Sequence, residues 1–573
     1  MKTSLITLFF VTQTLAACQS IAPSPKPVSD LILRGASVYT LDPQKPWADA
    51  VAIANNTIIA VGSEQEISAY RSATTRIMDL DNAMVLPGFH DAHMHPLEGG
   101  FLQQYCDLSE ATESVEAVTT KIRECAEESD QEWIIGFGID LSLFPQNGPD
   151  RALLDDIAPQ RLMFLDASDG HSAWVNSAVL ALAHIDDSTA DPAGGVIERR
   201  PGSTAPNGTL REVARDLADS LRPPREHQES TQAMREAIRL INAAGITSLI
   251  DAWSSELEMK VYKAIDDAGD LSVRVRNSIT DEGVFEKDTG ADFERVLSIR
   301  SQFESERIST GSIKMFVDGV MEGETAALVE PYVELGHTGF LNYSEAELFS
   351  RVTRYEAMGL QIHMHAMGDG AARAGLNAIE YAREQNIDNP RSQDLRHHMS
   401  HLQLVHPDDI NRFATLGVAA NFTGAWAYPD KWVTELNLPV LGSARVDRMY
   451  PMGSIVRAGG VVVGGSDWIY GPLNPLESIE VSITRQDPND SEAPPGNVAD
   501  ALDLEMALRA YTINAAWLMH QEKSVGSIEV GKRADLVILD RNLFEIPTTE
   551  ISEAKVQFTL FDGEIVYRAP QEN

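Results

Sequence analysis

The feature that most constrains the fold is a series of eight apolar, strand-like runs, separated mostly by segments long enough to be helices. The runs are Met84–His95, Ile246–Trp253, Val273–Ile279, Ser312–Val320, Gln361–Met367, His397–Val405, Gly417–Phe422 and Gly460–Asp467. Several are almost continuously apolar, which is typical of parallel strands covered on both faces. Strands alternating with helices over such a length predict an α/β fold, a (β/α)8 TIM barrel spanning residues 84–522.

Short strand-like runs also occur near both ends of the chain. They lie at 31–33, 50–54 and 57–61, and again at 534–539, 556–560 and 564–567. Each half-sheet has an apolar face that must be buried. We therefore expect residues 29–83 and 523–573 to pack together as one small composite β-sandwich.

The connection after the first barrel strand, about residues 98–225, is too long for an unstructured loop. It contains a helix-like segment, Ser114–Glu127, and a strand-like run, Arg161–Ala167. We expect an inserted subdomain that covers the barrel mouth and shapes a substrate pocket.

The first residues predict export. A lysine at position 2, a brief apolar stretch and small residues are typical of a secretory signal, here residues 1–17. The stretch Leu15-Ala16-Ala17-Cys18 resembles a bacterial lipobox, which would make Cys18 the lipidated N-terminus; the alternative is an ordinary signal peptide with a chance cysteine. Residues 18–28 are predicted to form a flexible tether. The lipobox resemblance implies the outer membrane, because Gln19 replaces the aspartate that typically retains such lipoproteins at the inner membrane. We expect a periplasm-facing lipoprotein, held at the membrane only by its anchor.

Composition excludes some partners. The formal net charge is −39, which argues against nucleic acid and anionic membrane surfaces as partners; solubility is its simplest explanation. The two remaining cysteines, Cys106 and Cys125, are compatible with a disulfide in an oxidising periplasm or with two buried thiols. The absence of a CxxC pair argues against a cysteine-based zinc site.

Residues with metal-ligating chemistry stand in the predicted strands. His93 and His95 are two positions apart, so both imidazoles face the same side of a strand. Lys314, the pair His363 and His365, His401 and Asp467 follow in later runs. Several of these residues also have a purely structural explanation. Lys314 could extend to solvent, one histidine of the pair could be a structural residue, and Asp467 could cap a helix. Together they predict a metal site, because strand ends converge at a barrel mouth.

In several segments the sequence resembles the amidohydrolase superfamily, in the branch called amidohydrolase 3 or YtcJ-like. The matching segments are 86–95, 171–177, 314–319, 363–369, 464–467 and 525–536. The resemblance implies metal ligation by His93, His95, Lys314, His365, His401 and Asp467. It also implies that Asp467 is the catalytic residue. His171 and Trp174 are candidates for substrate contact or for a folding role, and Asp369 and Trp468 are further candidates for substrate contact.

Two positions depart from the pattern of that branch. Ser400 stands where an acidic residue usually precedes the histidine of strand six, and Gly370 stands where an arginine usually follows the Gly-Asp of strand five. Neither change removes a ligand. Both are expected to alter hydrogen bonds around the metal or the choice of substrate.

The predicted function is metal-assisted hydrolysis of a C–N bond in a small amide or cyclic amide. The resemblance implies one or two Zn²⁺ ions, with a carbamylated Lys314 bridging them if there are two. The alternatives are a deaminase or a lactone or ester hydrolase on the same site, or a lipid-anchored binding or sensor protein with a vestigial site. A homodimer is left open.

Overall fold

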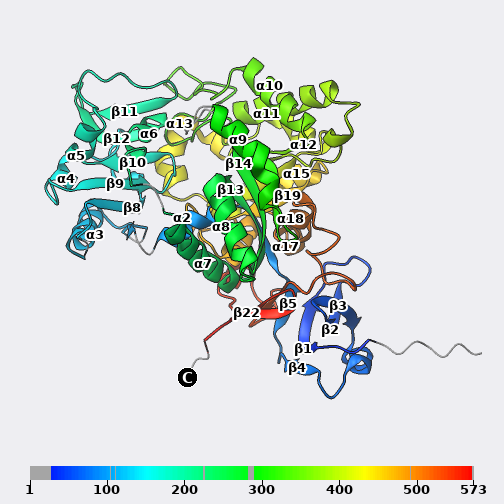
Figure 1. The fold of residues 1–573 in the computed structure, drawn as a ribbon. Coiled ribbons are helices and arrows are strands. Elements are labelled where there is room, and N and C mark those ends of the chain that lie inside the picture. The colour runs from blue at the N-terminus through cyan, green and yellow to red at the C-terminus, as the bar shows by residue number, and fades with distance from the viewer. Residues whose placement is uncertain are drawn as a thin grey trace, which may run out of the picture.

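The computed structural model describes residues 27–102, 105–109, 111–128, 130–223, 226–281, 290–490 and 492–570. The predicted signal peptide and the predicted lipidation site Cys18 lie outside these residues. Figure 1 shows a central barrel with the inserted segment on one side and strands from both chain ends on the other.

Eight parallel strands form the central sheet, in the order β19-β18-β17-β16-β15-β14-β13-β6. They are β6 (Phe89–Met94), β13 (Ile246–Ser254), β14 (Arg274–Thr280), β15 (Ile308–Phe316), β16 (Gln361–Ala366), β17 (His398–His401), β18 (Ala419–Thr423) and β19 (Val462–Gly465). Two backbone hydrogen bonds join the carboxyl ends of β6 and β19. The N–H of Asp467 donates to the carbonyl of His93 at 2.8 Å, and the N–H of His95 donates to the carbonyl of Trp468 at 2.7 Å. These bonds bring the first and last strands together, which confirms the predicted TIM barrel.

Helices follow the strands around the outside of the barrel. They are α7 (His227–Ala243), α8 (Glu256–Asp267), α9 (Gly290–Ile299), α10 (Glu345–Ala357), α11 (Asp369–Gln385), α12 (Ile410–Thr415), α15 (Met452–Arg457), α16 (Pro475–Thr484), α17 (Leu504–Ala510) and α18 (Ile513–Leu518). In α8 the capping box of Ser255 and Glu258 satisfies N–H groups at the helix start, and Met259 and Tyr262 are buried toward the barrel. The helices therefore supply the apolar layer that covers the strands.

The first predicted strand, Met84–His95, is divided into two in the structure. β5 (Met84–Pro87) pairs with β1 and β20 in the sheet formed by the chain ends, whereas β6 begins at Phe89 and belongs to the barrel. The break falls at Gly88, where an added Cβ would lie 2.3 Å from Oγ1 of Thr247. One apolar run therefore serves two sheets, a division that periodicity alone does not reveal.

The strands of the two chain ends form one continuous sheet. It contains β1 (Leu31–Tyr39), β2 (Trp47–Ala54), β3 (Thr57–Gly62), β4 (Arg76–Asp79), β5, β20 (Leu536–Leu539), β21 (Val556–Phe561) and β22 (Glu564–Arg568). We expected two half-sheets packed face to face; the structure joins them edge to edge through β5 and β20. Leu33 and Val51 from one end share a core with Ile538 and Leu560 from the other. Figure 1 shows the blue and red segments side by side.

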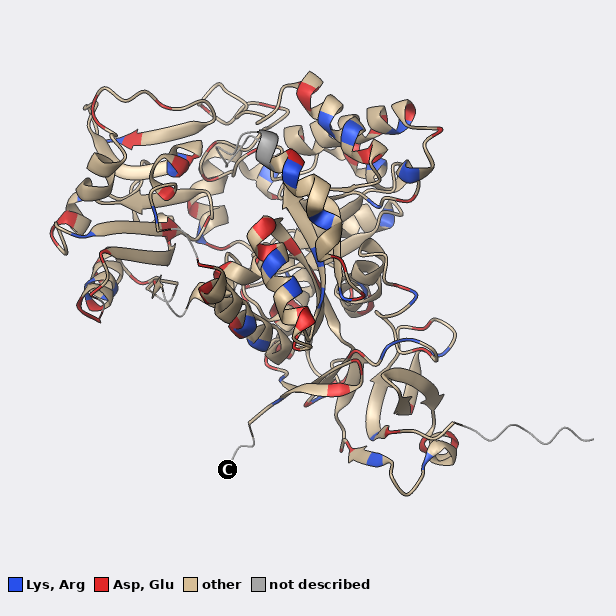
Figure 2. Ribbon diagram, viewed as in Figure 1, with Lys and Arg blue, Asp and Glu red and all other residues tan. Residues whose placement is uncertain are grey.

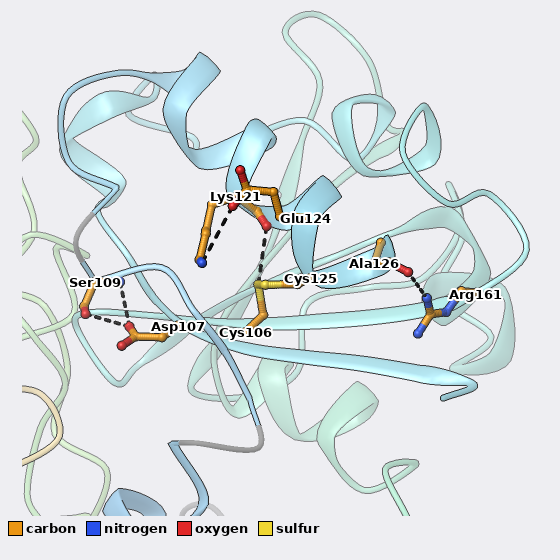
Figure 3. The surroundings of a disulfide bond; sticks show 8 residues. All are labelled: Cys106, Asp107, Ser109, Lys121, Glu124, Cys125, Ala126 and Arg161. Atoms are coloured by element: carbon orange, nitrogen blue, oxygen red, sulfur yellow. Dashed lines mark hydrogen bonds and ion pairs between the residues drawn. A yellow bond between two sulfur atoms is a disulfide. The ribbon is translucent and has the colours of Figure 1, made fainter. Parts of the chain in front are cut away.

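The inserted segment folds into a six-stranded sheet with the order β11-β12-β10-β9-β8-β7. Its strands are β7 (Cys106–Asp107), β8 (Trp133–Ile139), β9 (Leu162–Ala167), β10 (Ser172–Val175), β11 (Gly195–Arg199) and β12 (Pro206–Glu212). A disulfide joins Cys106 of β7 to Cys125 of α3 (Val115–Glu128), with a Cα–Cα distance of 5.7 Å (Figure 3). The sequence left open a disulfide or two buried thiols, and the structure contains the disulfide.

Charged residues of both signs are dispersed over the outer helices and loops (Figure 2). Asp and Glu total 85 against 46 Lys and Arg, so this dispersal leaves a large excess of negative charge. Among the described residues, no helix has both the length and the apolarity needed to cross a bilayer.

Candidate metal centre and substrate cavity

Three predicted ligands meet where the barrel closes. His93 lies on β6, His95 follows it directly, and Asp467 follows β19. Oδ1 of Asp467 lies 3.2 Å from Nε2 of His93 and 3.1 Å from Nε2 of His95. All three side chains are buried, and one ligand atom from each lies within 4.8 Å of the other two, which is close enough to share one cation.

The local sequence explains why these side chains converge. A Cβ at Gly465 would lie 2.7 Å from Cβ of His93, so glycine allows β19 to approach β6 closely. Buried Asp91 accepts hydrogen bonds from the N–H groups of His93 and Ser466, which links the same two strands. Asp467 and His401 both have positive φ, 54° and 76°. Non-glycine residues in this strained region are frequent at functional sites, which accords with the place of both at the barrel mouth.

Lys314 and His401 complete the group around His93. Nζ of Lys314 lies 3.4 Å from Nε2 of His93, and Nδ1 of His401 lies 3.7 Å from Oδ2 of Asp467. Lys314 is 1% exposed, so the solvent-reaching alternative for this lysine is wrong. We call the five residues His93, His95, Lys314, His401 and Asp467 the strand-end floor.

The pair His363 and His365 divides into two environments. Nε2 of His363 lies 3.0 Å from Nδ1 of His93 and 2.7 Å from Oγ of Ser400. His365 faces the cavity, with Nε2 at 3.1 Å from the carbonyl of Gly319 and its ring centroid 4.6 Å from that of His401. His363 therefore supports His93 from behind and has Ser400 as its own hydrogen-bond partner.

Burial and charge set the protonation of the floor. Burial lowers the pKa of His93 to about 3 and that of Lys314 to about 7. Burial alone would raise the pKa of Asp467, but the adjacent His93, His95 and His401 together hold it well below its usual range. The floor therefore combines neutral imidazole and ionised carboxylate, the protonation states in which these groups bind a metal.

The donor set fits a divalent cation. The Nδ1 atom of His401 is buried and has no hydrogen-bond partner among the described residues, although it faces the Asp467 carboxylate. An unsatisfied buried imidazole nitrogen is costly, and coordination of a cation would satisfy it. Imidazole and carboxylate ligands suit zinc and several other divalent metals.

The floor opens into a cavity of about 150 Å³. His171, from the inserted sheet, lines it and lies with its ring centroid 4.9 Å from that of His365. Burial disfavours the charged form of His171, but the carboxylate of Glu212, 2.7 Å from its Nδ1, outweighs this and raises its pKa. The inserted segment thus contributes a polar pair, His171 and Glu212, to the wall of the cavity.

Three other predicted substrate contacts lie elsewhere. Trp174 is fully buried in the core of the inserted segment, beside Phe144. Asp369 begins α11 and accepts a hydrogen bond from the N–H of Val329. The indole of Trp468 packs against Gly99, where an added Cβ would meet it at 2.3 Å. The structure gives none of the three a place among the residues that line the cavity.

Other cavity residues were not foreseen from the sequence. They include Trp253, Glu322, Trp426, Asp430, Trp432 and Tyr470. Glu322, Asp430 and Tyr470 lie in loops beyond the strand ends, and Trp426 and Trp432 lie in short helical turns there, where no periodicity marks them. Asp91 was also missed, although its position between His90 and His93 in the motif was a signal that could have found it.

A parallel eight-stranded barrel whose strand ends bring histidines and an aspartate together is an architecture that metal-dependent hydrolases use. A family model for the amidohydrolase family matches residues 76–567. The chain therefore belongs to the amidohydrolase family.

Similar proteins span nearly the same length. The chain is 28% identical to the N-substituted formamide deformylase of Arthrobacter pascens, over 94% of this chain and 98% of that protein. It is also 28% identical to YtcJ of Bacillus subtilis, over 94% and 99%. An uncharacterized metal-dependent hydrolase from Pyrococcus horikoshii has a similar fold, with a TM-score of 0.70 at 20% identity, covering 90% of this chain and 99% of that one.

Proposed function

We propose that the protein hydrolyses a C–N bond of a small amide, with Asp467 moving the proton and a divalent cation, zinc in our assignment, held at the strand-end floor. The observation that carries the proposal is the placement of Asp467. Its carboxylate lies 3.1 to 3.2 Å from two buried imidazoles, on the floor of a cavity large enough for a small molecule.

The cation would be held by His93, His95 and Asp467, with Lys314, His365 and His401 as further ligands. When bound, it supplies Lewis-acid activation of water and of the substrate carbonyl. Asp467 is ionised at neutral pH, so it can accept the proton of the attacking water and return it to the leaving nitrogen.

The environment of Lys314 favours carbamylation of its amine. A neutral amine attacks CO₂ and loses a proton to give a carboxylate, and burial lowers the pKa of Lys314 to about 7, which leaves much of the amine neutral. A carbamylated Lys314 would place two oxygen ligands beside His93 and favour two cations; a free lysine favours one.

The substrate class rests on a relative. The name of the Arthrobacter pascens protein specifies removal of formyl groups from N-substituted formamides. The match between the two proteins covers 94% of this chain. N-formyl and N-acyl amines are therefore the first substrates to test, with lactones and esters as the competing class.

The test is an activity screen of the purified protein after metal removal and after reconstitution with Zn²⁺. We expect hydrolysis of at least one formamide or N-acyl amine that disappears on chelation and returns with metal. Hydrolysis of esters or lactones alone, or failure to bind metal after careful purification, would reject the proposal.

We also propose that the protein is an exported lipoprotein facing the periplasm. The Cys106–Cys125 disulfide supports this, because such bonds persist in oxidising compartments. Expression in a bacterial host followed by membrane fractionation tests it: the native chain should sediment with outer membranes, and C18S should be released. A native chain recovered unprocessed in the cytosol would count against export.

A further inference from the structure

One wall of the cavity is built from acceptor groups and aromatic rings. Glu322 follows β15, Gln403 follows β17, and Trp426, Asp430 and Trp432 follow β18. We call these five residues the loop wall. They lie beyond the strand ends, whereas the strand-end floor lies at the ends themselves.

Two acceptor atoms of the loop wall are unsatisfied. Oε1 of Gln403 and Oε2 of Glu322 are buried and have no hydrogen-bond partner among the described residues. Gln403 is 5% exposed, and its amide is oriented by a hydrogen bond from Nε2 to the hydroxyl of Tyr450 at 2.9 Å. Because unsatisfied buried acceptors are costly, both atoms point to a ligand that donates hydrogen bonds.

The charges of the wall are also unbalanced. Among the described residues that line the cavity, Lys314 at the floor is the only lysine or arginine. His171, whose pKa is raised, lies near Glu322 and offsets part of its charge, but its Nδ1 is already paired with Glu212. Burial and nearby Asp169 raise the pKa of Glu322 to about 7, and burial together with Asp140 raises that of Asp430 to about 7. A cation in the cavity would relieve this repulsion.

The aromatic side chains point to the same kind of ligand. Trp426 and Trp432 line the cavity together with the two carboxylates. Tyr450 also lines it, but the guanidinium of Arg485 already lies over its ring, 5.9 Å from the centroid. The face of an aromatic ring attracts a cation, and a buried carboxylate beside it adds a direct ion pair. An anionic group would meet repulsion from Asp169, Glu322 and Asp430, all of which line this cavity.

Resting on the proposed function, we infer that the substrate carries a protonated amine, which Glu322, Asp430 and Gln403 bind while the scissile amide lies at the strand-end floor. The substrate class is thus an N-acyl or N-formyl derivative of a diamine or other cationic amine. A neutral amide of the same length would leave Oε1 of Gln403 and Oε2 of Glu322 unpaired and would give Asp430, which already accepts from the N–H of Val433, no cationic partner.

Binding can be measured without turnover. Hexylammonium and 1-hexanol have the same chain length, and only the first is cationic. Titration of each into the metal-loaded protein, followed by the fluorescence of the cavity tryptophans and by calorimetry, should show hexylammonium binding about tenfold more tightly or better. Equal affinities in the wild-type protein would overturn the inference, whatever the variants show.

Variants locate the cation. E322Q and D430N should each reduce the preference for hexylammonium, and the double variant should abolish it. E324Q is the matched control: Glu324 is two residues from Glu322 but does not line the cavity, so its loss should leave the preference intact. Thermal unfolding checks that each variant is folded. A preference that survives in folded E322Q and D430N variants would also overturn the inference.

A hydrolysis assay with two matched amides distinguishes failure of this inference from failure of the proposed function. N-(4-aminobutyl)formamide should be hydrolysed with a higher kcat/KM than N-pentylformamide, its neutral counterpart of similar length. If no amide is hydrolysed but hexylammonium keeps its preference, the proposed function fails and the cation site stands. If both amides are hydrolysed equally well, the proposed function stands and the cation site fails.

Discussion

The strand-end floor and the loop wall line the same cavity but differ in origin and in charge. The floor comes from strand ends and consists mainly of imidazoles around one ionised carboxylate, Asp467. The wall comes from the loops and short helical turns that follow the strands, and it carries two carboxyl groups whose pKa values burial raises. Our two proposals assign different roles to the two regions: the floor holds a cation and moves a proton, and the wall selects the molecule that reaches it.

The largest effect is expected at the floor. D467N should lower kcat about a thousandfold, because an amide cannot accept the proton of the attacking water. Metal content should be measured alongside activity, and saturating metal used in the assay. D369N is the control, since it removes a buried carboxylate outside the cavity. Turnover of D467N close to wild type would remove Asp467 from the mechanism.

A second floor variant tests the lysine. K314M keeps an unbranched side chain only one atom shorter than that of lysine but cannot form a carbamate, so metal affinity should fall about a hundredfold. Metal analysis of the purified variant gives the stoichiometry. Intact mass of the native protein, taken under mild conditions, should show the added CO₂. An unchanged metal content in K314M would mean that Lys314 serves only to pack against His93.

The inserted segment should affect substrate use more than metal binding. H171Q removes a ring that faces the cavity and its ion pair with Glu212, so kcat/KM should fall between about tenfold and a hundredfold. The metal content should match the wild type, because the floor is untouched. A loss of metal in H171Q would show that the inserted segment and the floor are not separable.

The smallest effect on activity is expected from the disulfide. Cys106 and Cys125 are 19 residues apart, so C125S should cost about 3 kcal/mol in the stability of the inserted segment. Limited proteolysis of this segment should quicken, and activity at low temperature should be retained. The double variant C106S/C125S controls for a free thiol. Full stability of both variants would contradict a structural role for the bond.

The floor was predictable because its residues follow a rule. Side chains at the ends of parallel strands must converge at one mouth of a barrel, so the placements of His93, Lys314 and Asp467 follow from where the apolar runs lie.

The loop wall and the domain edges were not predictable in this way. Glu322 and Asp430 lie in loops, and Trp432 begins a short π-helix; the course of such segments depends on tertiary packing and leaves no periodic signal. The division of Met84–His95 at Gly88 also depends on pairing with β20, more than four hundred residues away. For Trp174 the sequence left open a substrate contact or a folding role, and the structure favours the folding role, because β10 directs this side chain into the core of the inserted segment.

The most direct test of the account is the position of the metal. Crystals of the Zn²⁺-reconstituted protein, measured at the zinc absorption edge, should show an anomalous peak about 2.0–2.2 Å from Nε2 of both His93 and His95, with Asp467 also bound. A peak at another place, or none beside these three side chains in a protein that hydrolyses amides, would contradict it.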